Sequence, residues 1–449
     1  MLLSTPAYFL FLGAVFFAFW LMTRFRFAGL AVILAANYFL YAKFSLAYLA
    51  IIPLASSCDF LIGRALERSE RQGWRRFLVG LSILLNVGLI ASLKYFPLLA
   101  LGLSFYAFQS LTYTLDIFRR DATATKDYLA YLCSASFFPT ALAGPITRLS
   151  TLIPQMKKER VLDAGAGGAA LFLIGLGLVK KLLIADYLAE NLINRVFDLP
   201  KLYSGAEVLT AVYGYAFQLY FDFSGYTDIA LGSAMLLGIR LPVNFNRPYA
   251  AENIADFWRR WHITLSNWLR DYLYFSLPGL RSRWKIFTYA NLVITMAIGG
   301  LWHGAAWTFL VWGVVHGVGL AVVRCLQVLR GNVKPSANPV LRIVRIVVTF
   351  HFVAFAWIFF RAANLETARD ILSQIASMTV SFANVSPGFA VILAIAVAAH
   401  FAPKNWYELS RSSFVKSPAF VQAGAMALLV LAIQYVAATG AAPFIYTRF

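Results

Sequence analysis

Gly299-Gly-Leu-Trp-His-Gly-Ala-Ala-Trp-Thr-Phe309 places one imidazole, that of His303, between two tryptophans inside a long apolar run. Apolar runs of about 17–25 residues predict membrane-spanning helices. A lipid bilayer penalises buried polar groups, so a histidine at such a place needs a partner or a chemical role. Because imidazole titrates near neutral pH, His303 is a candidate general base.

The composition predicts the same environment for the whole chain. Of its 449 residues, 60% are hydrophobic and only 13% are charged, whereas soluble proteins carry about 25% charged residues. The mean hydropathy is +0.69. We therefore expect an all-α polytopic membrane protein with about 10–12 transmembrane or re-entrant helices.

The net charge of +19 follows the expected membrane topology and does not indicate nucleic acid. Basic residues gather in alternate loops, such as the one from Arg64 to Arg76. By the positive-inside rule these loops are cytoplasmic, and both the N-terminus and the C-terminus are extracytoplasmic. The first apolar run, Leu2 to Met22, has no basic region before it and reads as a first span, not a signal peptide.

Several apolar segments contain glycine or proline. Two of them, Phe137 to Ile146 and Gly214 to Gly238, are expected to be broken. Non-helical backbone at membrane depth is tolerated only where protein or a water-filled cavity surrounds it, so broken segments suggest an internal cavity or tunnel. No soluble domain or internal repeat is evident, and residues 1–449 are predicted to form a single membrane domain.

The longest polar insertion, at about 244–285, is predicted to be an amphipathic or re-entrant helix. Its apolar residues recur at steps of three and four and form one stripe. An interfacial helix with a basic face is the simpler interpretation. However, His262 lies on the stripe between tryptophans, where a polar group needs a partner or a function. The stripe consists of Trp258, Trp261, His262, Leu265, Trp268, Leu269 and Tyr272.

The remaining histidines carry less weight. His316 lies 13 residues after His303, so on one continuous helix the two would face opposite sides. It is either a helix-packing residue that hydrogen-bonds across the bundle or a functional group. His351 and His400 stand alone in apolar runs and are expected to be structural. No carboxylate or cysteine is spaced to complete a metal site with a histidine, so no metal is predicted.

Five segments together resemble the membrane-bound O-acyltransferase superfamily. The resemblance is to its bacterial branch, which contains alginate and peptidoglycan O-acetyltransferases and is related to proteins of teichoic acid D-alanylation. The segments occur in the family's order and span most of the chain. They are Phe137-Phe-Pro-Thr-Ala-Leu-Ala-Gly-Pro-Ile-Thr-Arg148, Tyr220-Phe-Asp-Phe-Ser-Gly-Tyr-Thr-Asp228, Asn246-Arg-Pro-Tyr249, Asp256-Phe-Trp-Arg-Arg-Trp-His-Ile-Thr-Leu-Ser266 and the Gly299 to Phe309 run.

This resemblance implies tilted helices around a central tunnel that crosses the membrane. An acyl-CoA would bind from the cytoplasm as a substrate, and no permanently bound cofactor is implied. The superfamily's catalytic histidine matches His303, and its second signature position, often asparagine or aspartate elsewhere, matches His262. Basic residues near the cytoplasmic mouth could contact the CoA phosphates, although each one could equally be ordinary positive-inside charge. These residues are Arg148, Arg259 and Arg260.

The C-terminal tail, residues 443–449, resembles the Phe-Ile-Tyr-x-x-Phe ending of this branch. Its tyrosine, which matches Tyr446, is thought to accept the acyl group and pass it on. An aromatic tail by itself is more often an interfacial anchor. A phenol with a pKa of about 10 is a poor nucleophile at neutral pH, so Tyr446 would need a base such as His303.

The resemblance thus predicts acetyl transfer from cytoplasmic acetyl-CoA, across the bacterial inner membrane, to an envelope polysaccharide. Because the chain has no Gly-x-Ser-x-Gly elbow, a serine esterase-like (SGNH-type) partner transferase is expected to complete the reaction. A transporter of a small anion or glycan precursor is the alternative from another class. Within the acyltransferases, a long-chain lipid or protein acyltransferase is the second possibility. The residues do not distinguish alginate-like from peptidoglycan acceptors.

Overall fold

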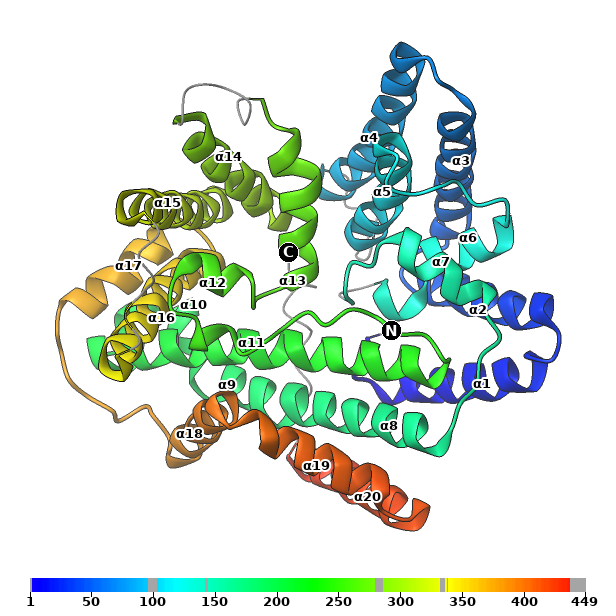
Figure 1. The fold of residues 1–449 in the computed structure, drawn as a ribbon. Coiled ribbons are helices and arrows are strands. Elements are labelled where there is room, and N and C mark those ends of the chain that lie inside the picture. The colour runs from blue at the N-terminus through cyan, green and yellow to red at the C-terminus, as the bar shows by residue number, and fades with distance from the viewer. Residues whose placement is uncertain are drawn as a thin grey trace. The chain divides into compact units, whose positions relative to one another are not determined.

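The structure is a computed structural model that describes residues 2–95, 103–141, 144–278, 286–331, 336 and 338–436. All regular secondary structure among these residues is helical (Figure 1). This confirms the all-α fold class. The chain divides into two compact units, and several helices contribute residues to both. Whether residues 1–449 act as one domain stays a prediction.

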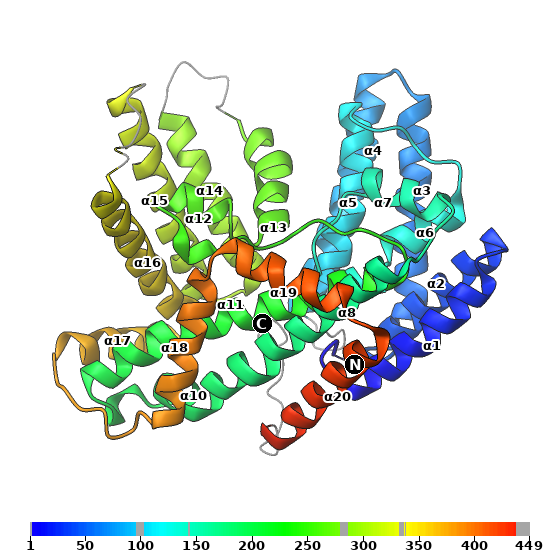
Figure 2. The same cartoon turned by 60° about the horizontal axis from the view of Figure 1, so that its bottom comes forward.

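The first unit comprises Met1–Leu178, Tyr226–Pro242 and Ser410–Ala427. Within it, α1 packs against α2, while α3, α4 and α5 pack against one another as a three-helix group (Figure 2). Its helices are α1 (Pro6–Met22), α2 (Arg26–Ala42), α3 (Tyr48–Arg68), α4 (Gln72–Tyr95), α5 (Leu103–Arg119), α6 (Tyr128–Ala135), α7 (Leu149–Lys157) and α8 (Ala164–Leu178).

The second unit comprises Val179–Gly225, Val243–Leu409 and Leu428–Phe449. Its most extensive helix pair is α14 with α15, and α15 also packs against α16 and α12. Helices wholly within it are α9 (Asp186–Leu188), α10 (Asn194–Asp198), α12 (Ile254–Trp258), α13 (Ile263–Trp268), α14 (Ile286–His303), α15 (Trp307–Arg330), α16 (Pro339–Arg361), α17 (Leu365–Ala376) and α18 (Pro387–Phe401). Helices α11 (Gly205–Leu236), α19 (Lys404–Lys416) and α20 (Ala419–Val436) contribute to both units.

Six of the described helices are long and apolar enough to cross a membrane, or seven if α18 and α19, bent by 94°, form one broken span. Three further apolar helices are shorter: Pro6–Met22, Arg26–Ala42 and Ala419–Tyr435. The polytopic membrane fold is therefore confirmed. The number of candidate spans is smaller than the expected 10–12 transmembrane or re-entrant helices, because apolar helices such as α1 and α2 are shorter than a full span.

One predicted break exists and the other does not. The Phe137–Ile146 stretch contains only a 3-10 turn, Phe138–Thr140, among its described residues, and that turn is buried. The Phe138 amide donates to Asn37 Oδ1 at 2.8 Å, which satisfies a backbone group that a helix would otherwise bond. By contrast, Gly214 to Gly238 lies almost wholly within unbroken α11. That prediction was wrong because Gly214 provides close helix packing against Phe389 and Ile193 instead of a break.

Candidate active site

His303 is the last residue of α14, where a helical hairpin turns. Only Gly304–Ala306 separate α14 from α15, which pack side by side (Figure 2). The two backbones approach closely because a Cβ on Gly300 would collide with the Phe309 carbonyl, and a Cβ on Gly313 would collide with the Met296 carbonyl. Glycine permits this contact.

Aromatic rings enclose the His303 imidazole, which is 6% exposed. Its ring centroid lies 4.7 Å from that of Trp302, 5.0 Å from Phe360 and 5.2 Å from Trp312. Such a shell excludes water and fixes the orientation of the ring. A histidine held in this way suits proton transfer to a bound substrate better than a mobile surface histidine does.

The hairpin brings His316 close to the same aromatic group. The two imidazoles do not share a continuous helix, and both contact the Trp312 ring, His303 at 5.2 Å and His316 at 5.1 Å. His316 is fully buried and stacks on Phe257 at 5.9 Å. Neither of its ring nitrogens has a hydrogen-bond partner in the described part of the chain. The cross-bundle hydrogen bond that the sequence suggested is therefore not found among the described residues, and the choice between packing and a functional role stays open.

The insertion that carries His262 is not one amphipathic helix. The regular elements of its described part are a 3-10 turn at Pro248–Ala250, α12, α13, a π-helical turn at Leu269–Leu273 and a 3-10 turn at Tyr274–Ser276. Residues 279–285 lie outside the described ranges. The apolar stripe is nevertheless largely buried: Trp258, Trp261, His262, Leu265, Leu269 and Tyr272 are each 8% exposed or less. The periodicity identified six of the seven stripe residues as buried, with Trp268 only partly buried, but tertiary contacts break the helix between them.

The break lies at His262, whose backbone is in the left-handed region at φ 41° and ψ 55°. Asn244 stabilises this turn, since its Oδ1 accepts from the Thr264 amide at 3.2 Å and from the Thr264 hydroxyl at 2.9 Å. The same oxygen lies 3.1 Å from His262 Nδ1. An amide oxygen can only accept, so Nδ1 carries the hydrogen and Nε2 the lone pair. Burial lowers the pKa of His262 to about 3, and the ring is neutral at pH 7.

The two candidate histidines belong to one cluster of aromatic side chains within the second unit. The His262 ring packs edge-on against Phe223 at 4.7 Å. Its neighbour Trp261 contacts Trp357 at 5.0 Å, and Trp357 stacks on Trp312 at 5.8 Å. Because Trp312 contacts His303, the two signature motifs meet through these tryptophans.

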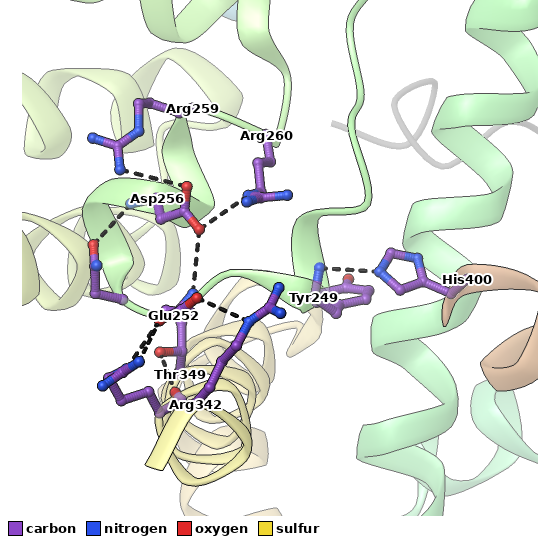
Figure 3. A network of polar contacts seen from close by, with 10 residues as sticks. Tyr249, Glu252, Asp256, Arg259, Arg260, Arg342, Thr349 and His400 are labelled. Carbon is purple, nitrogen blue, oxygen red and sulfur yellow. Dashed lines mark hydrogen bonds and ion pairs between the residues drawn. The ribbon is translucent and has the colours of Figure 1, made fainter. Parts of the chain in front are cut away.

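The candidate donor-binding arginines are paired with carboxylates (Figure 3). Arg259 Nη2 lies 3.4 Å from Asp256 Oδ1, and Arg260 Nε lies 3.0 Å from Asp256 Oδ2. The neighbouring Glu252 donates its amide to Asp256 Oδ2 at 3.3 Å. Glu252 in turn pairs with two arginines of α16, Arg342 at 3.1 Å and Arg345 at 2.8 Å. Four guanidinium groups thus share two carboxylates, and the network keeps a surplus of positive charge.

Arg148 does not belong to this network. It is part of the first unit, and one of its guanidinium nitrogens lies 3.9 Å from Asp116 Oδ1.

Tyr446 and the tail 443–449 lie outside the described residues. Two further histidines have structural contacts: His351 Nε2 lies 2.8 Å from the Tyr213 hydroxyl, and His400 Nε2 accepts from the Tyr249 amide at 3.1 Å. Within the described ranges, no three His, Cys, Asp or Glu side chains are grouped to hold a metal ion.

A buried ion cluster, linked to His262 through Phe223, was not predicted from the sequence. Lys181 Nζ lies 2.6 Å from Asp186 Oδ1 and 2.7 Å from Asp222 Oδ1, and the lysine side chain is 1% exposed. Asp222 directly precedes Phe223, which contacts His262. Charged residues within the apolar stretch Ala164–Asp198 were the signal that could have found the cluster.

Comparisons with known proteins agree with the resemblance of the motifs. A family model described as "MBOAT, membrane-bound O-acyltransferase family" matches residues 82–368, which include both His262 and His303. A "Probable alginate O-acetylase" of Pseudomonas putida is 32% identical over 470 residues, which cover 93% of this chain and 94% of that protein. A "Peptidoglycan O-acetyltransferase" of Helicobacter pylori is 32% identical over 422 residues, or 83% and 79% of the two chains.

A "Probable alginate O-acetylase" of Azotobacter vinelandii is 43% identical over 272 residues. That match covers 60% of this chain and only 52% of the relative, so the chain spans about half the length of that protein. The family match covers well over half of the chain and contains the hairpin and the left-handed turn that carry the two histidines. The chain therefore belongs to the membrane-bound O-acyltransferase family.

Proposed function

We propose that this chain is the membrane O-acetyltransferase component of a system that acetylates a cell-envelope polysaccharide. It takes acetyl from cytoplasmic acetyl-CoA in the bacterial inner membrane, with both termini extracytoplasmic. The observation that carries the proposal is the position of His303, buried among aromatic rings at the end of the α14–α15 hairpin in a member of an acyltransferase family. Relatives named for alginate and peptidoglycan acetylation support a polysaccharide acceptor.

In this reaction His303 acts as the general base. Its imidazole accepts the proton of an acceptor hydroxyl, and the hydroxyl oxygen attacks the thioester carbon of acetyl-CoA. The carbon–sulfur bond then breaks, and the imidazolium returns the proton to the CoA thiolate. The products are an acetyl ester and free CoA. The aromatic shell excludes water, which would otherwise hydrolyse the thioester.

His262 positions the donor in this proposal. Because its Nδ1–H is directed to Asn244 Oδ1, the orientation and tautomer of its ring are set by the protein. The neutral ring presents a lone pair at Nε2, which can accept from an amide N–H of the pantetheine arm. Replacing the ring would then weaken donor binding more than it would slow the chemical step.

The donor's phosphates are assigned to the arginine network at α12 and α16. Arg259 and Arg260 were candidates from the sequence, and the structure adds Arg342 and Arg345 beside them. Guanidinium groups bind phosphate oxygens in a bidentate fashion. Arg148 remains a further candidate, with its partial exposure of 42% in favour.

Acetyl leaves through a relay in which Tyr446 accepts it from CoA and a partner transferase of the SGNH type passes it to the glycan. His303 would deprotonate the phenol, since a tyrosine hydroxyl at neutral pH is otherwise a weak nucleophile. Membership of the acyltransferase family favours this chemistry over the transporter alternative.

The test measures the ester-linked acetate that mild base releases from separated envelope glycans. The cells carry the His303→Ala variant as their only copy of the protein. We expect acetate to disappear from one glycan fraction at an unchanged protein level. His351→Gln is the matched control, because His351 lies outside the aromatic shell and bonds Tyr213. Unchanged acetate in every fraction of the His303→Ala cells would contradict the proposal.

Tyr446→Phe isolates the relay from the base. If this variant exports acetyl normally while His303→Ala does not, the tail is an anchor and the base acts on another hydroxyl. Loss of acetate in both variants supports the relay. Accumulated acetyl on Tyr446 in cells that lack the partner transferase would show the intermediate directly.

A further inference from the structure

The first unit contains a carboxylate in the middle of a membrane-spanning helix. Asp59 lies near the centre of α3 (Tyr48–Arg68) and is 0% exposed. At 1.5 Å of rise per residue, about 14–17 Å of helix extends on either side. An ionisable group at this depth is costly and marks a functional site unless its charge is balanced.

Neutral groups alone bind the Asp59 carboxylate. Ser82 Oγ donates to Oδ1 at 2.6 Å, while Asn86 Nδ2 and Ser110 Oγ donate to Oδ2 at 2.8 Å and 2.7 Å. These donors come from α4 and α5, the two helices packed beside α3 (Figure 2). No lysine, arginine or histidine pairs with Asp59 in the part of the chain that the structure describes. The buried guanidinium of this helix group, Arg75, donates to the Ile117 and Phe118 carbonyls instead.

A second observation at the same place points to a missing positive partner. Asn86 is fully buried, and its Oδ1 has no hydrogen-bond partner in the described ranges. Its amide nitrogen is fully used, since Nδ2 donates to Asp59 and to the Ser82 carbonyl at 3.0 Å. Buried acceptors are rarely left without a donor or a cation. The Asn86 oxygen is therefore available as a ligand.

The surrounding hydroxyls also have lone pairs to offer. A serine or threonine oxygen that donates its hydrogen still has two acceptor positions. Thr114 Oγ1 extends the set, because it lies 2.8 Å from Ser82 Oγ. The oxygen cluster thus comprises one carboxylate, three hydroxyls and one amide oxygen from three helices. Its members are Asp59, Ser82, Asn86, Ser110 and Thr114.

We propose that this oxygen cluster binds a sodium ion. Hard oxygen ligands select hard cations, and nitrogen or sulfur ligands for a transition metal are absent from the five residues. One carboxylate neutralises one positive charge, whereas calcium sites usually supply several carboxylates and magnesium keeps several waters. The oxygens are 2.6–2.8 Å apart in hydrogen-bonded contacts and must move apart to coordinate an ion, so the smaller sodium requires less rearrangement than potassium. The site is independent of acetyl transfer and would make the stability of the helix group depend on sodium.

The test is the thermal unfolding midpoint of the full-length chain in detergent as a function of sodium chloride, with choline chloride holding ionic strength constant. We expect a saturable rise of the midpoint with sodium, as binding to the folded state alone requires. Asp59→Asn keeps the shape of the side chain and should abolish the rise. Glu67→Gln is the matched control: it makes the same charge change at an exposed position of α3 and should leave the rise intact.

Thr114→Val provides a second variant if Asp59→Asn does not fold. It removes one ligand at nearly constant volume, and the half-saturating sodium concentration should increase on the order of tenfold, the effect of about 1.4 kcal/mol. Three outcomes would overturn the proposal: a midpoint that choline raises as much as sodium, an unchanged response in Asp59→Asn, or an equal response to potassium. A midpoint that depends on pH through Asp59 but not on sodium would also overturn it, since the carboxyl would then hold a proton.

Discussion

Replacing Lys181 with methionine tests whether the buried ion cluster of Lys181, Asp186 and Asp222 stabilises the fold. The lysine and Asp222 side chains are each 1% exposed, and Lys181 Nζ lies within 2.7 Å of both Asp186 and Asp222. Methionine has a similar length but no charge, so the two carboxylates lose the cation between them. Removing one partner of a buried ion pair costs about 3–5 kcal/mol, because the charge left behind is desolvated. We expect a loss of stability of that size.

The matched control is Lys201→Met, which makes the same substitution in the same unit. Lys201 Nζ lies 3.0 Å from Asp370, but its side chain is 67% exposed. Exposed ion pairs contribute at most about 1 kcal/mol. Both variants can be compared by equilibrium unfolding in mixed micelles with an increasing mole fraction of SDS. The double variant Lys181→Met with Asp222→Asn should be less destabilised than Lys181→Met alone, since one buried charge is removed with its partner.

The reasoning is refuted if the Lys181→Met variant is as stable as the Lys201→Met variant. That outcome would mean that the carboxylates are neutral or hydrated and that the lysine balances no buried charge. If the expected loss is found, acetyl transfer should fall as well. Asp222 directly precedes Phe223, whose ring contacts His262 at 4.7 Å, so a shift of this turn of α11 reaches the candidate site.

Three further predictions follow from single contacts. Because the pKa of His262 is lowered to about 3, only the unfolded state binds its proton between about pH 3 and pH 6.5. Stability should therefore decrease as the pH is lowered through this window, by up to about 1.4 kcal/mol per pH unit, and His262→Asn should flatten this slope. Gly313→Ala should lose about 1–3 kcal/mol by collision with the Met296 carbonyl, whereas Gly424→Ala, with open space around it, should be neutral or stabilising in the same unfolding assay. His316→Phe should be at least as stable as the native chain and retain acetyl transfer, since neither ring nitrogen has a hydrogen-bond partner among the described residues. Loss of transfer at native stability would assign His316 a chemical role.

Composition and local pattern were sufficient for the fold class, and they singled out the two candidate histidines. A hydrophobic fraction of 60% with few charges, together with long apolar runs, indicates a helical membrane protein. The motifs around His262 and His303 each contain a polar residue among apolar ones, and that local contrast can be read without a structure. The break after Phe137 was also predictable, because Pro139 and Gly144 lie within a few residues of each other.

The errors arose where contacts distant in sequence override local periodicity. The stripe from Trp258 to Tyr272 has helical spacing, yet Asn244 bonds Thr264 and His262 and bends the backbone between α12 and α13. Likewise, the glycines of α11 are compatible with either a break or close packing. Only the position of Phe389, far along the chain, decides between them.

The polar networks could not be predicted for the same reason. Lys181 and Asp222 are 41 residues apart, and Glu252 pairs with Arg342 and Arg345 on a helix about 90 residues further on. A sequence shows that a charge lies in an apolar run, but not which opposite charge the fold brings to it. The sequence therefore identified residues of the candidate site but not the residues that hold them in place.

The left-handed backbone at His262 restricts what evolution can place there. Most side chains with a Cβ avoid positive φ, whereas asparagine, aspartate and histidine are several-fold enriched at it. These three residue types are also the ones that the superfamily resemblance associates with this signature position. The backbone conformation at φ 41° thus limits which substitutions are tolerated at this position. It allows exchange among three hydrogen-bonding side chains of different proton affinity and discourages most others before any effect on chemistry is felt.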